Sequence, residues 1–252
     1  MTDATAKPAR HHEPAPPATD PTAFRAVVEG RRSVRKFTDR EIPQDVLDDI
    51  IDLALLAPNS SNLQPWEFII VRKPELRREL SIACTDQNAA KTAPVMVVVL
   101  SHTGTWKQSA EQILREWPMP HTPKLVQQYY GKLIPVHFAT GPLDVAGRSK
   151  QLIQTLAAPF KVLPKMHHSE ADIRVWAAKS TALACENLML AARAHGFDSC
   201  PMEGFDEGRV KKLVQAAPDT FVNMVIALGE RAPDGVYYPR QRFPRAQMVR
   251  EL

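Results

Sequence analysis

The sequence predicts a fold that combines α-helices with a β-sheet, and three observations lead to this class. Apolar residues recur at helical spacing in several segments, and the longest of these runs from Glu170 to His195. Short unbroken apolar runs, such as Val95 to Leu100, have the length and composition of buried strands. Proline and glycine separate these segments, as Gly196 does after the long helix. The chain is therefore expected to form a mixed helix-and-strand domain.

Length and composition are those of an ordinary globular protein. The chain has 252 residues, enough for one large domain or two small ones, with 44% hydrophobic and 24% charged residues. Its net charge of +4 is too small to demand a polyanionic partner such as nucleic acid. Three cysteines without metal-binding spacing indicate reduced thiols and a cytoplasmic location. The apolar runs are too short to span a bilayer and the N-terminus lacks a signal-peptide core, so no membrane partner is expected.

The first hundred residues are predicted to hold a tail, three helices and two strands. Residues 1–19 are rich in Pro, Ala and Thr and are expected to be a disordered tail, in which the pair His11-His12 lacks a third metal ligand. Asp20-Pro21 has the composition of a helix N-cap followed by a proline at the first helical position. The next elements are a helix from Pro43 to Pro58, a strand over 67–71, a helix over 74–83 and a strand over 95–100.

Residues 101–170 are proline-rich and show no strand pattern of their own. We interpret them as a helical excursion or lid within a single domain spanning residues 20–252, and none of their five histidines has the spacing of a metal ligand. The long alanine-rich helix that follows is expected in the core or in a subunit interface. After it, the pattern predicts a short strand before Cys200, a helix over 207–216, a strand over 221–228 and an arginine-bearing tail.

Two segments carry candidate chemistry. Arg31-Arg32-Ser33-Val34-Arg35-Lys36-Phe37 places four cations and a hydroxyl within seven residues, and arginine forks match phosphate oxygens. Taken alone, this run favours a solvated basic turn or a nucleic-acid patch. The loop from Pro58 to Trp66 holds two serines, two asparagines and a glutamine between prolines. A plain turn and a set of directed hydrogen-bonding groups explain that loop equally well.

Five motifs in this chain resemble those of the nitroreductase family of FMN-dependent oxidoreductases. In chain order they are Arg31-Arg32-Ser33-Val34-Arg35, Ser60-Ser61-Asn62-Leu63-Gln64-Pro65-Trp66, Trp176-Ala177-Ala178-Lys179, Pro201-Met202-Glu203-Gly204-Phe205-Asp206 and Arg240-Gln241-Arg242-Phe243-Pro244. One such match would be weak, but five in the right order are specific. The resemblance covers nearly everything after the N-terminal tail. It implies an α+β fold, with a mixed sheet of four or five strands flanked by helices, and a homodimer with swapped termini and FMN at its interface.

The resemblance also implies which residues contact FMN. The phosphate would be held by Arg31, Ser33, Arg240 and Arg242, with Arg32 beside them, and Arg35 would face the pyrimidine edge of the flavin. Ser60, Ser61, Asn62 and Gln64 would approach from the partner subunit. Met202, Glu203 and Gly204 form the turn whose last two residues would place backbone N–H groups at flavin N5. Asn88 and Lys91 match a position on the substrate side of the ring.

The function implied by the resemblance is hydride transfer from NADH or NADPH, through FMN, to an electron-poor aromatic acceptor. Nitroaromatics, including nitrobenzoates, or quinones are the acceptors usual in the family, and no side-chain acid or base is required because the flavin carries the chemistry. Relatives that dehalogenate substrates reductively or cleave flavin are an alternative within the enzyme class. A non-enzymatic binder of nucleic acid or of a phosphorylated ligand is an alternative of another class.

Overall fold

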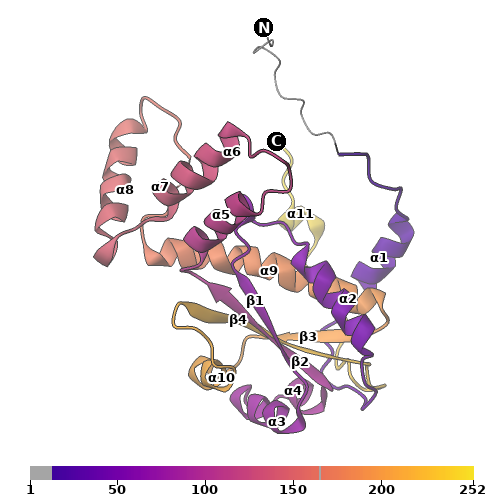
Figure 1. Cartoon of the computed structure of the whole chain (residues 1–252). Helices are drawn as coiled ribbons and strands as arrows, with labels where there is room; N and C mark the ends of the chain where they lie inside the picture. Colours follow the sequence, from indigo (N-terminus) through magenta and orange to yellow (C-terminus); the bar gives the residue numbers. More distant parts are fainter. Residues whose placement is uncertain (1–12, 165) are drawn as a thin grey trace.

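The computed structural model describes residues 13–164 and 166–252. Within these residues, four strands form one sheet in the order β1-β2-β4-β3, and every neighbouring pair is antiparallel (Figure 1). The strands are β1 (Trp66–Val71), β2 (Val95–His102), β3 (Asp198–Met202) and β4 (Thr220–Gly229). An isolated bridge between Ser33 and Ser199 adds a parallel contact beside β3. The predicted combination of helices with a small sheet is therefore confirmed.

Helices cover both faces of this sheet. One face packs against α2 (Gln44–Leu55) and α9 (Glu170–Ala194), and the other packs against α3 (Pro74–Ala83), α4 (Asn88–Thr92) and α10 (Glu207–Leu213). Successive side chains of β2 alternate between these two cores, with Val97 on the α2 and α9 side and Val98 on the opposite side. Because β2 is buried on both faces, its sequence is an unbroken apolar run from Val95 to Leu100.

The N-terminal helix begins as the sequence predicts. Helix α1 (Pro21–Gly30) has proline at its first position, and the backbone N–H of Thr22 donates to Asp20 Oδ1 over 2.8 Å. The pair His11-His12 and most of the predicted tail lie outside the described residues. Residues 13–19 have no regular secondary structure.

The segment between β2 and α9 is helical, as predicted. It consists of α5 (Trp106–Arg115), α6 (Lys124–Gln128), the π-helix η2 (Tyr129–Leu133), α7 (Ile134–Phe138), the 3-10 helix η3 (Pro142–Asp144) and α8 (Val145–Ala157). Phe138 packs edge-on against Trp176 of α9 with 4.7 Å between ring centroids, inside a separate apolar cluster. The sequence prediction placed this excursion at residues 101–170, and in the structure the segment between β2 and α9, which we call the excursion, is residues 103–169. Its role as a lid stays a prediction.

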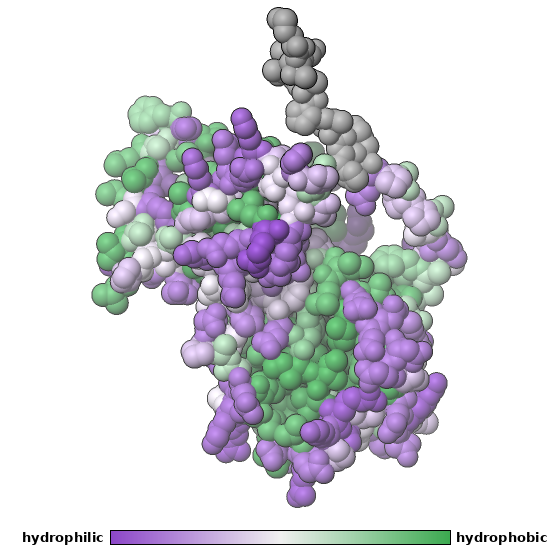
Figure 2. Space-filling view, in the orientation of Figure 1, coloured by the Kyte–Doolittle hydropathy of each residue, from purple (hydrophilic) through white to green (hydrophobic). Residues whose placement is uncertain are grey.

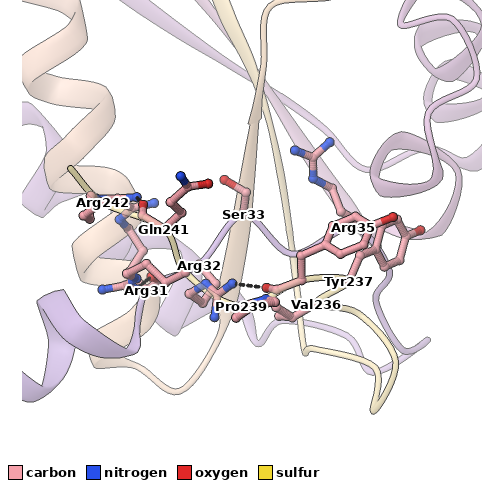
Figure 3. Close-up of a pocket in the computed structure, with 11 residues that line it drawn as sticks. Arg31, Arg32, Ser33, Arg35, Val236, Tyr237, Pro239, Gln241 and Arg242 are labelled. Carbon is pink, nitrogen blue, oxygen red and sulfur yellow. Dashed lines mark hydrogen bonds between the residues drawn. The ribbon is translucent and has the colours of Figure 1, made fainter.

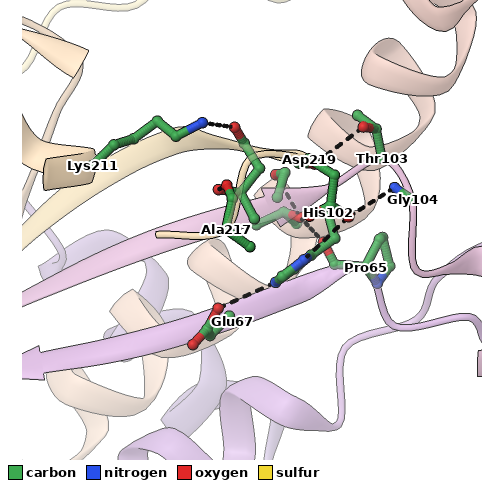
Figure 4. Close-up of polar contacts among 11 residues, drawn as sticks. Pro65, Glu67, His102, Thr103, Gly104, Lys211, Ala217 and Asp219 are labelled. Carbon is green, nitrogen blue, oxygen red and sulfur yellow. Dashed lines mark hydrogen bonds and ion pairs between the residues drawn. The ribbon is translucent and has the colours of Figure 1, made fainter. Parts of the chain in front are cut away.

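A polar network attaches the start of the excursion to the sheet (Figure 4). His102 Nε2 lies 3.2 Å from Glu67 Oε2, and the other ring nitrogen lies 3.9 Å from Asp219 Oδ2. Asp219 also accepts two hydrogen bonds from backbone N–H groups. The N–H of Thr103 donates to the Asp219 carbonyl oxygen over 2.9 Å, and the N–H of Gly104 donates to the Asp219 carboxylate over 3.2 Å. These contacts fix the chain where it leaves the sheet.

Two details differ from the sequence prediction. The short strand does not end before Cys200, because β3 continues through Pro201 to Met202. Proline is tolerated there since β3 is the edge strand of the sheet. On α9, apolar spacing predicts that Leu183 is buried with the rest of the apolar stripe, but it is 48% exposed.

No helix within residues 13–164 and 166–252 is long and apolar enough to cross a membrane.

Candidate functional site

The basic segment after α1 is held against the sheet by its backbone. The N–H of Val34 donates to the carbonyl of Ser199 over 3.0 Å, and the N–H of Arg35 donates to the carbonyl of Gly235 over 2.7 Å. Val34 is completely buried, while Ser33 and Arg35 on either side of it are exposed. This alternation is that of an extended strand. The buried valine therefore anchors the segment and directs the neighbouring polar side chains outward.

The C-terminal segment returns to this basic segment, and together they enclose a cavity of about 390 Å³ (Figure 3). Its lining residues come from both ends of the chain: Arg31, Arg32, Ser33, Arg35, Val236, Tyr237, Tyr238, Pro239, Arg240, Gln241 and Arg242. We call this the basic cavity. Six residues assigned to the cofactor from the sequence line it, four from the first motif and two from the last.

Side-chain hydrogen bonds join the two segments. Arg240 donates through Nη2 to the carbonyl oxygen of Glu29 over 2.8 Å, and the same nitrogen donates to the carbonyl of Arg31. Arg32 Nη2 donates to the carbonyl of Tyr238 over 2.6 Å. Arg240 thus satisfies carbonyl groups at the C-terminal end of α1, where the helix itself supplies no donors. Its guanidinium has a structural role in addition to its charge.

The basic cavity holds more positive charge than the protein neutralises. Arg31 lies 3.6 Å from Glu186, but within the described residues no carboxylate pairs with Arg32, Arg35 or Arg242. The pKa of Arg240 is lowered, first by desolvation and then by the charges of the neighbouring arginines. A group of arginines whose members repel one another is stabilised by a bound anion, and a phosphate dianion matches their donor geometry best.

One further predicted residue, Asn88, contacts a residue that lines the basic cavity. Asn88 Nδ2 donates to the hydroxyl of Tyr237 over 2.7 Å, and Tyr237 lines the cavity. The preceding residue, Gln87, donates to the carbonyl of Gly204 over 2.9 Å. Helix α4 therefore connects the turn after β3 to the C-terminal segment.

The remaining predicted cofactor residues of this region do not line the basic cavity, and they differ in exposure. In the turn itself, Glu203 and Gly204 are exposed and Met202 is 3% exposed. Lys91 is exposed on α4, three residues after Asn88. Glu203 and Gly204 are thus accessible to a ligand, and Met202 supports them from the core.

The loop Ser60–Gln64 is not part of the basic cavity in one chain. It contains the 3-10 helix η1 (Ser60–Asn62), and Ser61, Asn62 and Gln64 all have positive φ angles, of 63°, 51° and 47°. The backbone N–H of Gln64 donates to Asn59 Oδ1 over 2.9 Å, which stabilises this unusual conformation. Three residues of the loop, Asn62, Leu63 and Gln64, line a different hollow of about 610 Å³, against α5 of the excursion. The approach of this loop to the flavin of a partner subunit stays a prediction.

Sequence reasoning missed several residues of the site. Tyr237 and Tyr238 line the basic cavity, and Gly235 accepts the hydrogen bond that positions Arg35. Their segment was interpreted only as a tail with arginines, although two adjacent tyrosines beside Arg240 are an available signal for a ligand-facing segment. No pattern in the sequence indicates Gly235, because its importance depends on chain segments about 200 residues apart.

Replacing Gly235 by alanine should separate the two halves of the basic cavity. A Cβ atom there would overlap the carbonyl oxygen of Lys36 and lie 3.0 Å from that of Ala232. Relief of this overlap must move backbone, so we expect a loss of about 1–2 kcal/mol in the free energy of unfolding, measured by urea denaturation. Gly131→Ala is the matched control, since a Cβ at Gly131 meets no atom of the described chain within 4 Å. Equal stability of the two variants would contradict the close approach.

Comparison with known proteins gives a consistent result. The Nitroreductase family model matches residues 28–230. The DrgA protein of Synechocystis is 28% identical over 215 residues, which is 85% of this chain and 87% of that protein. The NADH dehydrogenase of Thermus thermophilus is 26% identical over 219 residues, covering 87% of this chain and 91% of that protein.

Solved structures agree on the fold. The ydfN protein of Bacillus subtilis has a TM-score of 0.73 at 22% identity and covers 92% of this chain and 99% of its own. A protein of Exiguobacterium sibiricum, solved in complex with FMN, has a TM-score of 0.67 at 23% identity and covers 93% of this chain and 98% of its own. At these identities, the structural likeness establishes the fold alone. Because the family model matches most of the sequence, the chain belongs to the nitroreductase family, as its five motifs predict.

Proposed function

We propose that the protein is an FMN-dependent oxidoreductase that takes hydride from NADH or NADPH and passes it to an electron-poor aromatic acceptor. The observation that carries this proposal is the meeting of the two basic ends of the chain. Residues about 200 positions apart, from Arg31 to Ser33 and from Arg240 to Arg242, line one cavity, and of its arginines only Arg31 has a carboxylate partner among the described residues. Family membership and the FMN complex of the Exiguobacterium sibiricum protein support the identity of the ligand.

The chemistry of the donor set fits FMN. Arg31, Ser33 and Arg242 would hold the phosphate, and Arg240 would brace the wall of the cavity while adding positive charge. Bound FMN would supply the hydride-transfer chemistry, alternating between donor and acceptor. The tasks left to this chain are binding, orientation and electrostatics.

Arg35 has a separate task in this proposal. It lies at the edge of the basic cavity and close enough to Cys200 to oppose the effect of burial, which raises the pKa of that thiol. A cation beside the flavin pyrimidine edge would stabilise negative charge on the reduced ring. The exposed Glu203-Gly204 turn would present backbone N–H groups to the ring, without any side-chain acid or base.

A homodimer is part of the proposal, because single chains leave large apolar side chains uncovered. Phe24 on α1 is 62% exposed, Leu56 immediately after α2 is 76% exposed, and Val175 on α9 is 54% exposed. Large apolar side chains exposed in this way are typical of a surface that a second copy covers in an obligate interface. A second copy covering it would bring its own Ser60–Gln64 loop towards the flavin.

An absorption spectrum tests the cofactor and the donor together. We expect the purified protein to be yellow, with flavin bands that bleach when NADPH or NADH is added under nitrogen and return when a nitroarene or quinone is added. Colourless protein that neither binds added FMN nor catalyses its reduction by NADPH or NADH would contradict the proposal. Protein that instead bound DNA with a steep salt dependence would support the alternative of a nucleic-acid binder.

The acceptor class needs a separate comparison. Turnover of a neutral nitroarene should exceed that of a halophenol at equal NADPH, because the Asn62-Leu63-Gln64 loop follows the nitroreductase pattern. Faster loss of halide from the halophenol would instead identify a reductive dehalogenase.

A further inference from the structure

Helix α8, at the outer edge of the excursion, packs with its polar side inward. Lys150 donates through Nζ to the carbonyls of Val136 and His137 over 3.0 and 3.1 Å, and Gln154 Nε2 donates to the carbonyl of Pro164 over 2.7 Å. Gln154 also contacts the His168 ring, with 2.6 Å between Oε1 and Nε2. The side of the helix that faces the protein is therefore held by polar contacts.

The position of α8 is also fixed by close backbone contact. Gly147 is buried, and a Cβ atom at this position would overlap the backbone carbonyl of His168. Its N–H donates to the carbonyl of Thr140 over 2.9 Å. The helix thus cannot roll to turn its other side inward without losing these contacts.

The apolar side chains of α8 point to solvent as a consequence. Val145, Leu152 and Leu156 are spaced 7 and 4 residues apart, on one side of the helix, and are 62%, 62% and 66% exposed. Beyond the helix end, Phe160 is 90% exposed and Val162 is 98% exposed. We call these five residues, together with the 64% exposed Ile153, the outer apolar face. Hydrophobic residues appear at the corresponding edge of the molecule in Figure 2.

Positive charge accompanies this face. Residues 103–165 contain eight Lys and Arg against three Asp and Glu, whereas the rest of the chain has 24 against 25. From Val145 to Pro164 there is no acidic residue, and the exposed Arg148 and Lys161 flank the outer apolar face. An amphipathic helix with an apolar face bordered by cations is the arrangement that binds at the surface of anionic membranes.

We propose that the outer apolar face docks the protein on an anionic phospholipid surface. The helix would lie in the plane of the headgroups, its leucines and Phe160 in the acyl boundary and its flanking cations among lipid phosphates. Its last two apolar side chains, Phe160 and Val162, are almost fully exposed, which suits insertion into lipid. It also lies at the opposite side of the molecule from α1 and α2, where a second copy is proposed to pack (Figure 1).

Membrane docking is independent of the proposed enzymatic function. It revises the expectation from the sequence that the protein has no membrane partner. Surface docking requires no spanning helix, so it is compatible with the helices described. A docked protein would have access to lipid-dissolved acceptors, a class to which quinones with apolar tails belong.

Co-sedimentation with vesicles tests the proposal on the full-length protein. We expect binding to phosphatidylcholine vesicles that contain phosphatidylglycerol, weaker binding at high salt, and little binding to pure phosphatidylcholine. Leu152→Ser with Leu156→Ser should reduce the partition constant at least about tenfold, since each buried leucine contributes roughly that factor. Arg148→Glu with Lys161→Glu should abolish the preference for phosphatidylglycerol.

The matched control changes two exposed apolar residues on the far side of the sheet. Leu76→Ser with Ile82→Ser on α3, where the wild-type residues are 37% and 48% exposed, should bind vesicles as the wild type does. Wild-type protein that stays in solution with both kinds of vesicle would overturn the proposal. So would a Leu152→Ser, Leu156→Ser variant that changes oligomeric state in analytical ultracentrifugation, because the face would then contact a second copy. Flavin content and bleaching by NADPH, measured on every variant, report separately on the enzymatic proposal.

Discussion

Removing Arg31 and Arg242 together should lower FMN affinity at least a hundredfold. Both guanidinium groups line the basic cavity, one from each end of the chain. A charge-assisted hydrogen bond contributes about 1.5–3 kcal/mol, so loss of both should cost about 3 kcal/mol or more. The two effects will not add completely, because removing one cation relieves repulsion on the other. Titration of flavin-free protein with FMN, followed by the quenching of flavin fluorescence, measures the dissociation constant.

The control for this double variant is Arg25→Ala. Arg25 lies on α1, six residues before Arg31, and among the described residues its ion pair is an exposed one with Glu29 at 3.4 Å. It should leave FMN affinity unchanged. Undiminished FMN binding by the Arg31→Ala, Arg242→Ala protein would show that the basic cavity is not the phosphate site.

The sequence predicts which residues form the site better than it predicts what each residue does. Arginine clusters at both ends of the chain are visible as motifs, and their chemistry indicates an anion. That Arg240 donates to the carbonyls of Glu29 and Arg31 could not be predicted, because the contact joins positions 209 and 211 residues apart. The place of Tyr237 in the site could not be predicted for the same reason, since its hydrogen-bond partner Asn88 lies 149 residues away in the sequence.

The elements were predicted well where burial and local signals agree. Helix α3 was predicted with its observed bounds, and β2 was recognised by its apolar run because both of its faces are buried. For helix α8, the apolar pattern does not predict the orientation that the structure shows. Apolar periodicity predicts that the apolar face turns to the core, but polar contacts and the Gly147 approach orient this helix the other way. Only the tertiary contacts contain that information.

Asp198→Ala should destabilise the protein by about 3 kcal/mol, because it leaves two arginines without their shared buried carboxylate. Asp198 is 3% exposed, and its two oxygens accept from Arg231 over 2.8 and 3.1 Å and from Arg193 over 3.2 Å. The expected loss lies at the lower end of the range for buried ion pairs, since the side chains of Arg193 and Arg231 are 31% and 34% exposed. Urea denaturation of the flavin-free protein measures it.

Glu230→Ala is the matched control, since it removes a carboxylate that pairs with Arg40 at 2.7 Å on the surface, and it should destabilise the protein much less than Asp198→Ala. Asp198→Ala should also weaken FMN binding, because Arg231 Nη2 donates to the carbonyl of Gly30 over 3.3 Å, immediately before Arg31. The carboxylate would thus position the phosphate-binding arginine through Arg231, without touching the ligand. If Asp198→Ala lost stability but bound FMN as tightly as the wild type, the end of α1 would be held by Arg240 alone.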